Sequence, residues 1–126
     1  MIEALFNGAG YSGIKSMLDA TMLRHEAIAS NLANVETPNY KRVDVAPAFE
    51  NELRHAINHK DANRIRHLHP ALAVDQNAIA RGRDGNSVQL EEELSLMQKN
   101  VVEHSLETQM LTGYLMKLRM AITGRG

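Results

Sequence analysis

The chain has 126 residues, 23% of them charged, and a net charge of −1, so it fits one small domain and is not a polycationic nucleic-acid binder. It contains no cysteine, which excludes disulfides, cysteine-based zinc sites and a thiol nucleophile. Only 4% of its residues are aromatic, so the apolar material is mainly Leu, Met, Ala, Val and Ile, a composition that suits helix packing.

The first thirteen residues contain Glu3 and no Lys or Arg, and their apolar residues do not form a continuous run. We therefore expect no cleavable signal peptide. The longest apolar stretches of the chain span only a few residues, whereas about 20 are needed to cross a bilayer. No membrane-spanning segment is expected.

A first long helix is predicted from about Tyr11 to Asn34, because residues spaced alternately by four and three positions fall on one helical stripe. The helix should end before Pro38, which disfavours helical backbone at Thr37. Asn39 then tolerates the positive φ of a tight turn.

Residues 41–87 form a middle segment with a different pattern. Val43 and Val45 alternate with polar residues, which predicts a short extended piece. Pro47 favours the start of a short helix extending to about His59. From residue 61 to 83 the periodicity weakens, and we predict loops and short extended pieces. The apolar face of the short helix consists of Phe49, Leu53, Ala56 and Ile57.

A second long helix is predicted within residues 88–126. Glu91 to Glu93 lie in its first turns and Lys117 and Arg119 near its end, as the helix dipole favours, and solvation is expected for the three glutamates. Its apolar stripe runs through Leu90, Leu94, Met97, Val101, His104, Thr108, Leu111, Leu115, Leu118 and Ile122.

The two stripes predict an all-α fold in which two long terminal helices pack as an antiparallel coiled-coil hairpin, with a loop-rich middle segment containing a short helix. One register places His25 opposite His104 and Thr21 opposite Thr108, whereas the alternative leaves four mixed layers at a cost of about 1 to 3 kcal/mol for each unpartnered polar group. The first register also brings residue 3 opposite residue 126. The predicted seam consists of Ile14, Leu18, Thr21, His25, Ile28, Leu32 and Val35, facing Leu94, Met97, Val101, His104, Thr108, Leu111 and Leu115.

The chain is thus expected to be one structural unit, divided into residues 1–40, 41–87 and 88–126. A further apolar row lies on the second long helix, away from the predicted seam. Because the middle segment has little apolar material to cover it, we expect contact with other copies or other helical subunits. The row consists of Val102, Leu106, Met110 and Tyr114.

The residue types that carry chemistry do not form a convincing site. His55 and His59 have the spacing of two metal ligands on one helix, but no third ligand is placed, so no metal or cofactor is predicted. His25 and His104 are interpreted as a polar packing layer rather than as catalytic bases. No catalytic residue is predicted, and the chain is not expected to be an enzyme.

Two other classes of function remain as alternatives. A helical-hairpin regulator would bind a partner protein or nucleic acid, and a histidine-based metalloenzyme is the more remote of the two. The mild basic cluster formed by Arg64, Arg66, Arg81 and Arg83 has no interleaved aromatic residues, so no nucleic-acid partner is predicted.

Residues 29–40, with the sequence ASNLANVETPNY, resemble the N-terminal signature of the flagellar rod, hook and hook-associated family. In that family an Ala/Asn-rich helix end runs into Thr-Pro-Gly and an aromatic residue, and this chain has Asn39 where Gly is usual. Asn also tolerates positive φ, so the turn is expected to form. The motif turn is identified with Asn31, Ala33, Asn34, Thr37, Pro38, Asn39 and Tyr40.

The segment from Asp84 to Val88, followed by Leu90, the three glutamates and Asn100, is similar to the proximal rod members of the same family. The resemblance implies a structural subunit of the proximal rod, a torque-transmitting drive shaft required for motility, with the neighbouring rod protein FlgC as the alternative identity. It implies a location in the basal body, in the periplasmic space, after export without a cleaved signal. The partners it implies are other copies of the chain, the rod proteins FlgC and FlgF, the adaptor FliE, the ring protein FliF and the flagellar type III export apparatus.

Overall fold

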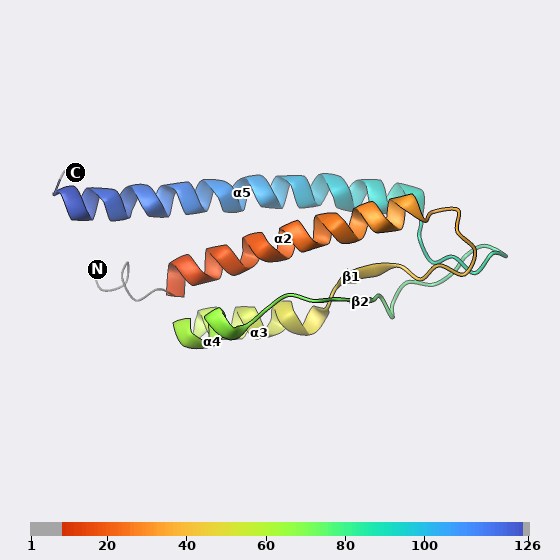
Figure 1. The fold of residues 1–126 in the computed structure, drawn as a ribbon, viewed down its shortest axis with the longest axis horizontal. Coiled ribbons are helices and arrows are strands. Elements are labelled where there is room, and N and C mark those ends of the chain that lie inside the picture. Colours follow the sequence, from red (N-terminus) through yellow and green to blue (C-terminus); the bar gives the residue numbers. More distant parts are fainter. Residues whose placement is uncertain (1–8, 125–126) are drawn as a thin grey trace.

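The computed structural model describes residues 9–124, which form an elongated, mostly helical molecule (Figure 1). Helix α2 spans Ala9–Ala33 and helix α5 spans Leu90–Thr123, close to the bounds predicted for the two long helices. The predicted juxtaposition of residues 3 and 126 lies outside the described residues. The elements between the long helices are β1 (Val43–Val45), α3 (Pro47–Asn58), α4 (Ala62–His67) and β2 (Leu72–Val74).

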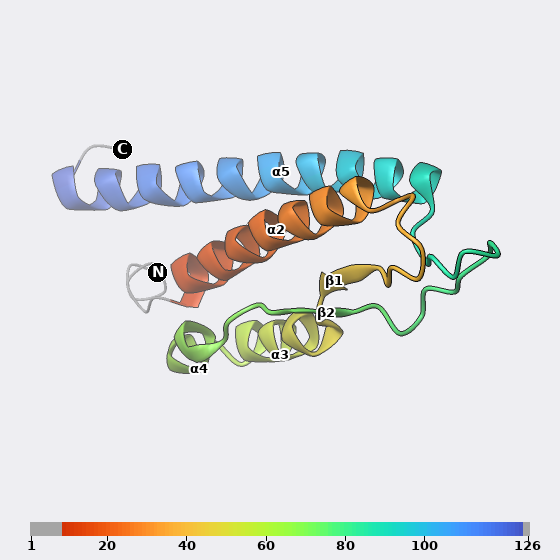
Figure 2. The ribbon, with the colours of Figure 1, turned by 45° about the vertical axis from the view of Figure 1, so that its right-hand side comes forward.

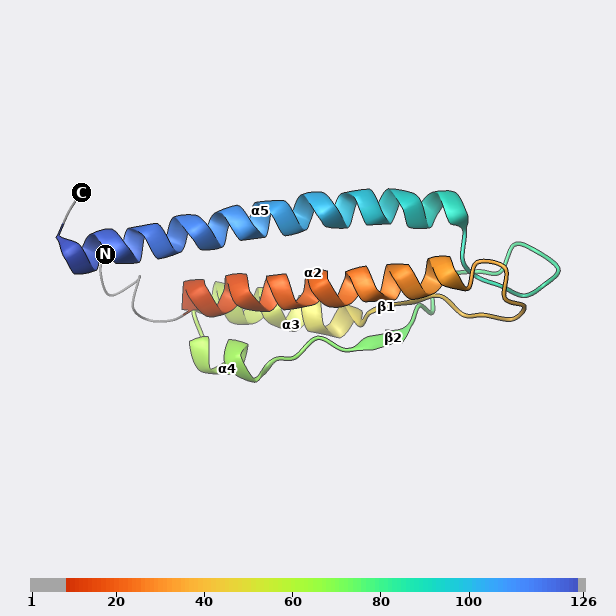
Figure 3. The same cartoon turned by 45° about the horizontal axis from the view of Figure 1, so that its top comes forward.

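The long helices run in opposite directions, and α2 is the central layer of the molecule. Helix α5 covers one side of α2, while α3, α4 and the strands cover the other, as Figures 2 and 3 show from two further directions. The loops that end α2 and precede α5 gather at one end of the molecule. At the opposite end α5 extends beyond the start of α2.

The middle segment contains more regular structure than its pattern predicts. Strands β1 and β2 form a two-stranded antiparallel ribbon in which Val43 pairs with Val74 and Val45 with Leu72. Helix α4 begins where the Asp61 carboxylate accepts a hydrogen bond from the backbone N–H of Arg64 at 3.0 Å. The chain is therefore mostly helical with a small ribbon, and the all-α expectation omits that ribbon.

The apolar core lies on the side of α2 that faces away from α5. Phe49, Leu53 and Ala56 of α3 are buried there together with Ala20 of α2 and Ile65 of α4. Burying a side chain of Leu or Phe size contributes about 1.5 to 3 kcal/mol, so this cluster is the main apolar attachment of the middle segment. The middle segment thus packs on α2 rather than on α5.

The middle of the contact between α2 and α5 is polar, and its register differs from the predicted one. Asn100 Nδ2 donates to the Thr21 carbonyl oxygen at 2.9 Å, and the Thr21 hydroxyl donates to Glu107 at 2.9 Å. Thr108, the predicted partner of Thr21, instead donates to the His104 carbonyl oxygen of its own helix at 2.8 Å.

The predicted seam is accordingly only partly buried, because α5 turns its polar side towards α2. His25 and His104 line one cavity between α2 and α5, but both are exposed, so the prediction that they form a packed layer is wrong. In α2, the buried seam residues are Ile14, Thr21 and Ile28, and the half-buried ones are Leu18 and Leu32, with Val35 half-buried just after the helix. In α5, Met97 and Leu111 are half-buried, and Leu94, Val101, His104, Thr108 and Leu115 are exposed. The prediction failed because it assumed that apolar stripes must face a partner within the same chain.

Candidate functional site

A tight turn over residues 34–40 ends α2. The Thr37 backbone N–H donates to the Asn34 carbonyl oxygen at 3.0 Å, and the Thr37 hydroxyl donates to the Asn34 side-chain oxygen at 3.1 Å. Asn39 follows Pro38 with φ of 62°, so the positive φ predicted there is confirmed. The turn holds the exit angle of the chain from α2.

The loop before α5 packs directly on this turn. The Asn39 backbone N–H donates to the Asp84 carbonyl oxygen at 2.7 Å. Gly85 has φ of 74°, and a Cβ at this position would collide with the Asn39 side-chain oxygen. Glycine is favoured here by the positive φ, and a larger residue would also have to displace the Asn39 side chain.

Asn86, in the same loop, binds the turn that follows α2. Its Nδ2 donates to the carbonyl oxygens of Asn34 and Thr37, each at 2.8 Å, and its Oδ1 accepts from the Val88 N–H at 2.7 Å. Both carbonyls belong to the turn that follows α2, so one buried side-chain amide binds the loop before α5 to that turn. The turn and the start of α5 are thereby joined.

Asn31, within the motif, binds the first strand as a neighbouring strand would. Its Oδ1 accepts from the Val43 backbone N–H at 3.0 Å, and its Nδ2 donates to the Val43 carbonyl oxygen at 2.8 Å. The Tyr40 hydroxyl also donates to Asn31 Oδ1 at 3.3 Å, and Asn31 is fully buried. The other motif residue at the helix end, Ala33, is exposed. The motif therefore fixes β1 and the turn against α2.

Arg42 is the centre of a buried ionic cluster beside Asn31. Its Nε donates to Glu93 of α5, and its Nη1 donates to Asp44 at 3.1 Å and to Asp75 at 2.8 Å. Glu93 is fully buried and also accepts from Asn31 Nδ2 at 3.3 Å. The cluster joins α2, the β ribbon and α5, so it positions the long helices relative to the middle segment.

The charges of the cluster support one another. Burial alone would raise the pKa of Asp44, but hydrogen bonds from the Val45 N–H, Arg24 and Arg42 lower it below its ordinary value. Burial alone would lower the pKa of Arg42, but its hydrogen bond to Glu93 and the attraction of that carboxylate raise it. The folded chain therefore favours the ionised forms of Asp44 and Arg42.

Sequence patterns did not identify this cluster. The alternation around Val43 and Val45 gives no sign that Arg42 is buried, and the expectation that Glu93 is solvated is wrong because Glu93 has no exposed surface. The one available signal was Asn31 within the motif, because buried asparagine at a helix end requires hydrogen-bond partners from elsewhere.

Helix α5 carries two exposed apolar stripes that α2 leaves largely uncovered. The seam stripe consists of Leu90, Leu94, Val101, Leu115 and Ile122, which are 40% to 75% exposed. The outer stripe consists of Val102, Leu106, Met110, Met116 and Met120, which are 43% to 59% exposed. Only Glu93 and Asn100 of this 34-residue helix are buried, so the described chain leaves most of the apolar surface of α5 open. Surfaces of this kind mark sites of association between proteins.

The four residues of the row predicted for subunit packing lie in two different environments. Val102, Leu106 and Met110 belong to the outer stripe. Tyr114 is half-buried and faces the start of α2, where its ring lies 6.2 Å from that of Tyr11 between centroids. The first three residues therefore belong to an open surface, and Tyr114 belongs to the contact between the long helices.

The histidines do not assemble a centre in the described part of the chain. His55 and His59 stack with ring centroids 4.1 Å apart on the exposed side of α3, and His59 Nδ1 lies 2.8 Å from the His55 carbonyl oxygen. Within residues 9–124, no three histidine or carboxylate side chains lie close enough together to hold a metal ion. None of the described helices has a stretch long and apolar enough to cross a bilayer.

Comparison with known proteins identifies relatives that span nearly the whole chain. The chain is 32% identical to the flagellar basal body rod protein FlgB of Aquifex aeolicus, over 96% of this chain and 97% of that protein. It is 32% identical to FlgB of Borrelia hermsii, over 83% of this chain and 89% of that protein. It is 25% identical to FlgB of Bacillus subtilis, over 96% and 98% of the two chains. No protein-family model matches the sequence.

Proposed function

We propose, from the premise that this chain belongs to the family of flagellar basal body rod proteins named FlgB, that it builds the proximal part of the rod. As a member of this family it is a structural subunit of the flagellar basal body rod and serves motility. The relatives carry the name FlgB, which favours this identity over the neighbouring rod protein FlgC. In the proximal rod it would transmit torque as part of the drive shaft.

The open apolar surface of α5 is the observation that supports assembly through the terminal helices. Each residue of the outer stripe is about half exposed, so covering it would contribute on the order of 1 kcal/mol per side chain. The two stripes lie on different sides of one helix, so two neighbours can contact α5 at once. We propose that the long helices coil with helices of neighbouring subunits through these stripes, and that the whole chain acts as one structural unit.

The proposed partners are other copies of the chain, the rod proteins FlgC and FlgF, the adaptor FliE and the ring protein FliF. Other flagellar proteins are its partners by family, and these specific ones follow from the proposed proximal position. We further propose that the flagellar type III apparatus exports the chain without cleaving a signal, and that the assembled subunit lies in the periplasmic space. No cofactor and no nucleic acid take part.

A motility assay with purified basal bodies tests this function. Cells lacking the gene should not swim, and the wild-type gene should restore swimming and place the protein in basal bodies. The variant Leu106→Glu puts a charge in the outer stripe and should prevent incorporation, whereas the matched variant Leu106→Met keeps the stripe apolar and should be incorporated. Normal swimming by cells without the gene would refute the proposal.

A further inference from the structure

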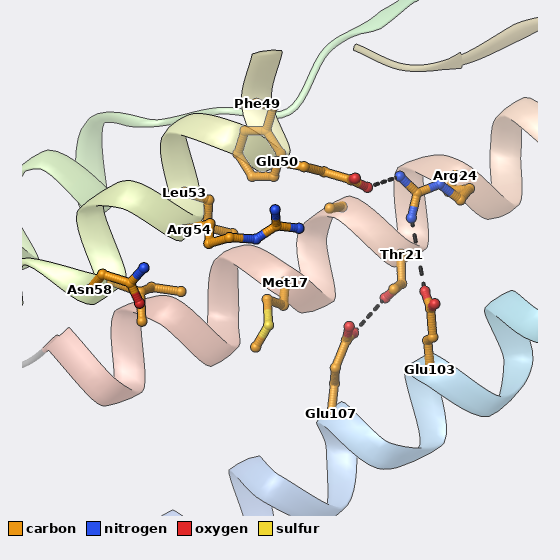
Figure 4. A pocket seen from close by; sticks show the side chains of 12 residues that line it. Met17, Thr21, Arg24, Phe49, Glu50, Leu53, Arg54, Asn58, Glu103 and Glu107 are labelled. Atoms are coloured by element: carbon orange, nitrogen blue, oxygen red, sulfur yellow. Dashed lines mark hydrogen bonds and ion pairs between the residues drawn. The ribbon is translucent and has the colours of Figure 1, made fainter. Parts of the chain in front are cut away.

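A groove lies where α2, α3 and the middle of α5 meet (Figure 4), with a volume of about 260 Å³. Its apolar lining comes from Met17 of α2 and from Phe49, Leu53 and Ile57 of α3. Ligand pockets for small molecules usually have about 300 to 1,000 Å³ and bury most of the ligand. The smaller volume fits a few side chains of a docked helix better than a small molecule.

The α5 wall of this groove is acidic. Glu103 and Glu107 line it, one helical turn apart, and Figure 4 shows Glu107 directed towards Thr21 across the groove. Glu103 lies 3.9 Å from Arg24, whereas Glu107 accepts a hydrogen bond from the Thr21 hydroxyl and makes no ion pair with any residue of the described range 9–124. Arg24 and His104 attract the Glu107 charge from beyond ion-pair distance, so this half-buried carboxylate has electrostatic support but no direct ion pair within the described residues.

The free end of α5 carries the complementary chemistry. Tyr114 faces the first turn of α2, and residues 115–123 continue beyond it for about 13 Å at 1.5 Å per residue. This end presents the exposed side chains of Met116 and Met120, with Lys117 exposed beside them. Apolar groups therefore flank a cation, as apolar groups flank the Glu107 carboxylate in the groove.

We propose that the groove receives the end of α5 from a second copy of this chain, with Lys117 of one copy paired to Glu107 of the next. The proposal rests on the function proposed above and specifies one contact within the rod. Lys117 and Glu107 are about 15 Å apart along the same helix, so they cannot pair within one copy. In a polar rod all copies point the same way, so the contact repeats head to tail with an axial offset of about 15 Å and does not close on itself.

Disulfide crosslinking in basal bodies tests the contact, because the natural chain has no cysteine. The double variant Glu107→Cys, Lys117→Cys should give a ladder of crosslinked oligomers in basal bodies under oxidising conditions. The matched double variant Glu52→Cys, Lys117→Cys moves the first cysteine to the exposed face of α3 outside the groove and should give no ladder. A closed dimer alone, crosslinks only to other rod proteins, or no crosslink would each overturn the proposal.

Charge exchange covers the case in which cysteine variants do not assemble. Glu107→Lys alone and Lys117→Glu alone should each lower incorporation into basal bodies on the order of tenfold, because they place like charges together. The combined exchange should restore incorporation towards the wild-type level. If the double variant loses incorporation by a factor as large as the product of the two single-variant factors, the two residues do not interact and the proposed pair is overturned. Wild-type protein absent from basal bodies would overturn the function itself, whereas wild-type protein present there without the Glu107–Lys117 coupling would overturn only this contact.

Discussion

Removal of one partner of the buried Arg42–Glu93 pair should destabilise the chain more than removal of both. Glu93→Leu leaves Arg42 with Asp44 and Asp75 as partners. The buried Nη2 of Arg42 has no hydrogen-bond partner among residues 9–124 even before the substitution. Arg42→Met leaves a fully buried Glu93 carboxylate with only the long hydrogen bond from Asn31. The double variant replaces both charges by apolar groups of similar size.

The expected size follows from the burial of the pair. Breaking a buried ion pair costs about 3 to 5 kcal/mol, whereas replacing both partners by apolar side chains is often close to neutral. Arg42→Met should lie in that range, and Glu93→Leu should cost about 2 to 3 kcal/mol because two carboxylates still face Arg42. The double variant should cost less than Arg42→Met alone. The coupling energy between the two sites should therefore exceed about 2 kcal/mol.

Urea unfolding followed by circular dichroism measures these differences in the free energy of unfolding. The adjacent Glu92 supplies the control, because it pairs with Arg81 at 3.3 Å while both side chains are more than half exposed. Glu92→Leu should change stability by less than about 1 kcal/mol. Additive effects of the Arg42 and Glu93 variants would refute the argument that the pair acts as a buried unit.

Three further predictions concern the turn, the groove and α5. Asn39→Val should impair motility at normal expression, because valine resists φ of 62°, whereas Asn39→Gly should swim normally; normal swimming by the valine variant would contradict the role of the turn. Burial, together with the charge of Glu103, raises the pKa of Glu107 above the ordinary 4.5, although the hydrogen bond from Thr21 lowers it. As pH rises, the Glu107 carboxyl therefore loses its proton at a lower pH in the unfolded chain than in the folded chain. The stability that protonated Glu107 contributes below pH 4.5 should therefore be lost as pH rises through the folded-state pKa. Glu107→Gln should remove this part of the dependence of unfolding free energy on pH, and an unchanged dependence would contradict the prediction. Amide hydrogens of α5 after Glu107 should exchange fast in the isolated chain, measured by mass spectrometry, and slowly in basal bodies, and strong protection in the isolated chain would contradict coupled ordering.

The positions of the long helices could be predicted because each spans many turns with sustained periodicity. Helix α4 could not, since its six residues bury only Ile65 and are too few to show a period. The partners of Asn31 and Glu93 were also beyond sequence patterns, because a hydrogen bond between α2 and α5 joins residues 62 positions apart. A motif indicates that a buried polar residue matters, but only the fold identifies what it binds.

The register error has a physical cause that bears on assembly. The prediction matched apolar stripes within one chain, although polar layers between the helices here find hydrogen bonds, as Asn100 does with the Thr21 carbonyl. Apolar stripes then remain on the surface, where solvent contact costs free energy until a neighbour covers them.

Because the buried apolar core lies against α2 and the exposed stripes lie on α5, the two long helices should differ in stability. Helix α2 contacts the apolar core of the middle segment and is held in the isolated chain, whereas α5 buries only Glu93 and Asn100 of its own residues. A helix with so little buried surface gains most of its order from packing against partners. An isolated chain with a well-held α2 and a loosely held end of α5 would unfold more readily than the assembled one, as the proposed export route requires. The same apolar stripes that weaken the isolated chain would then stabilise the rod once neighbours cover them.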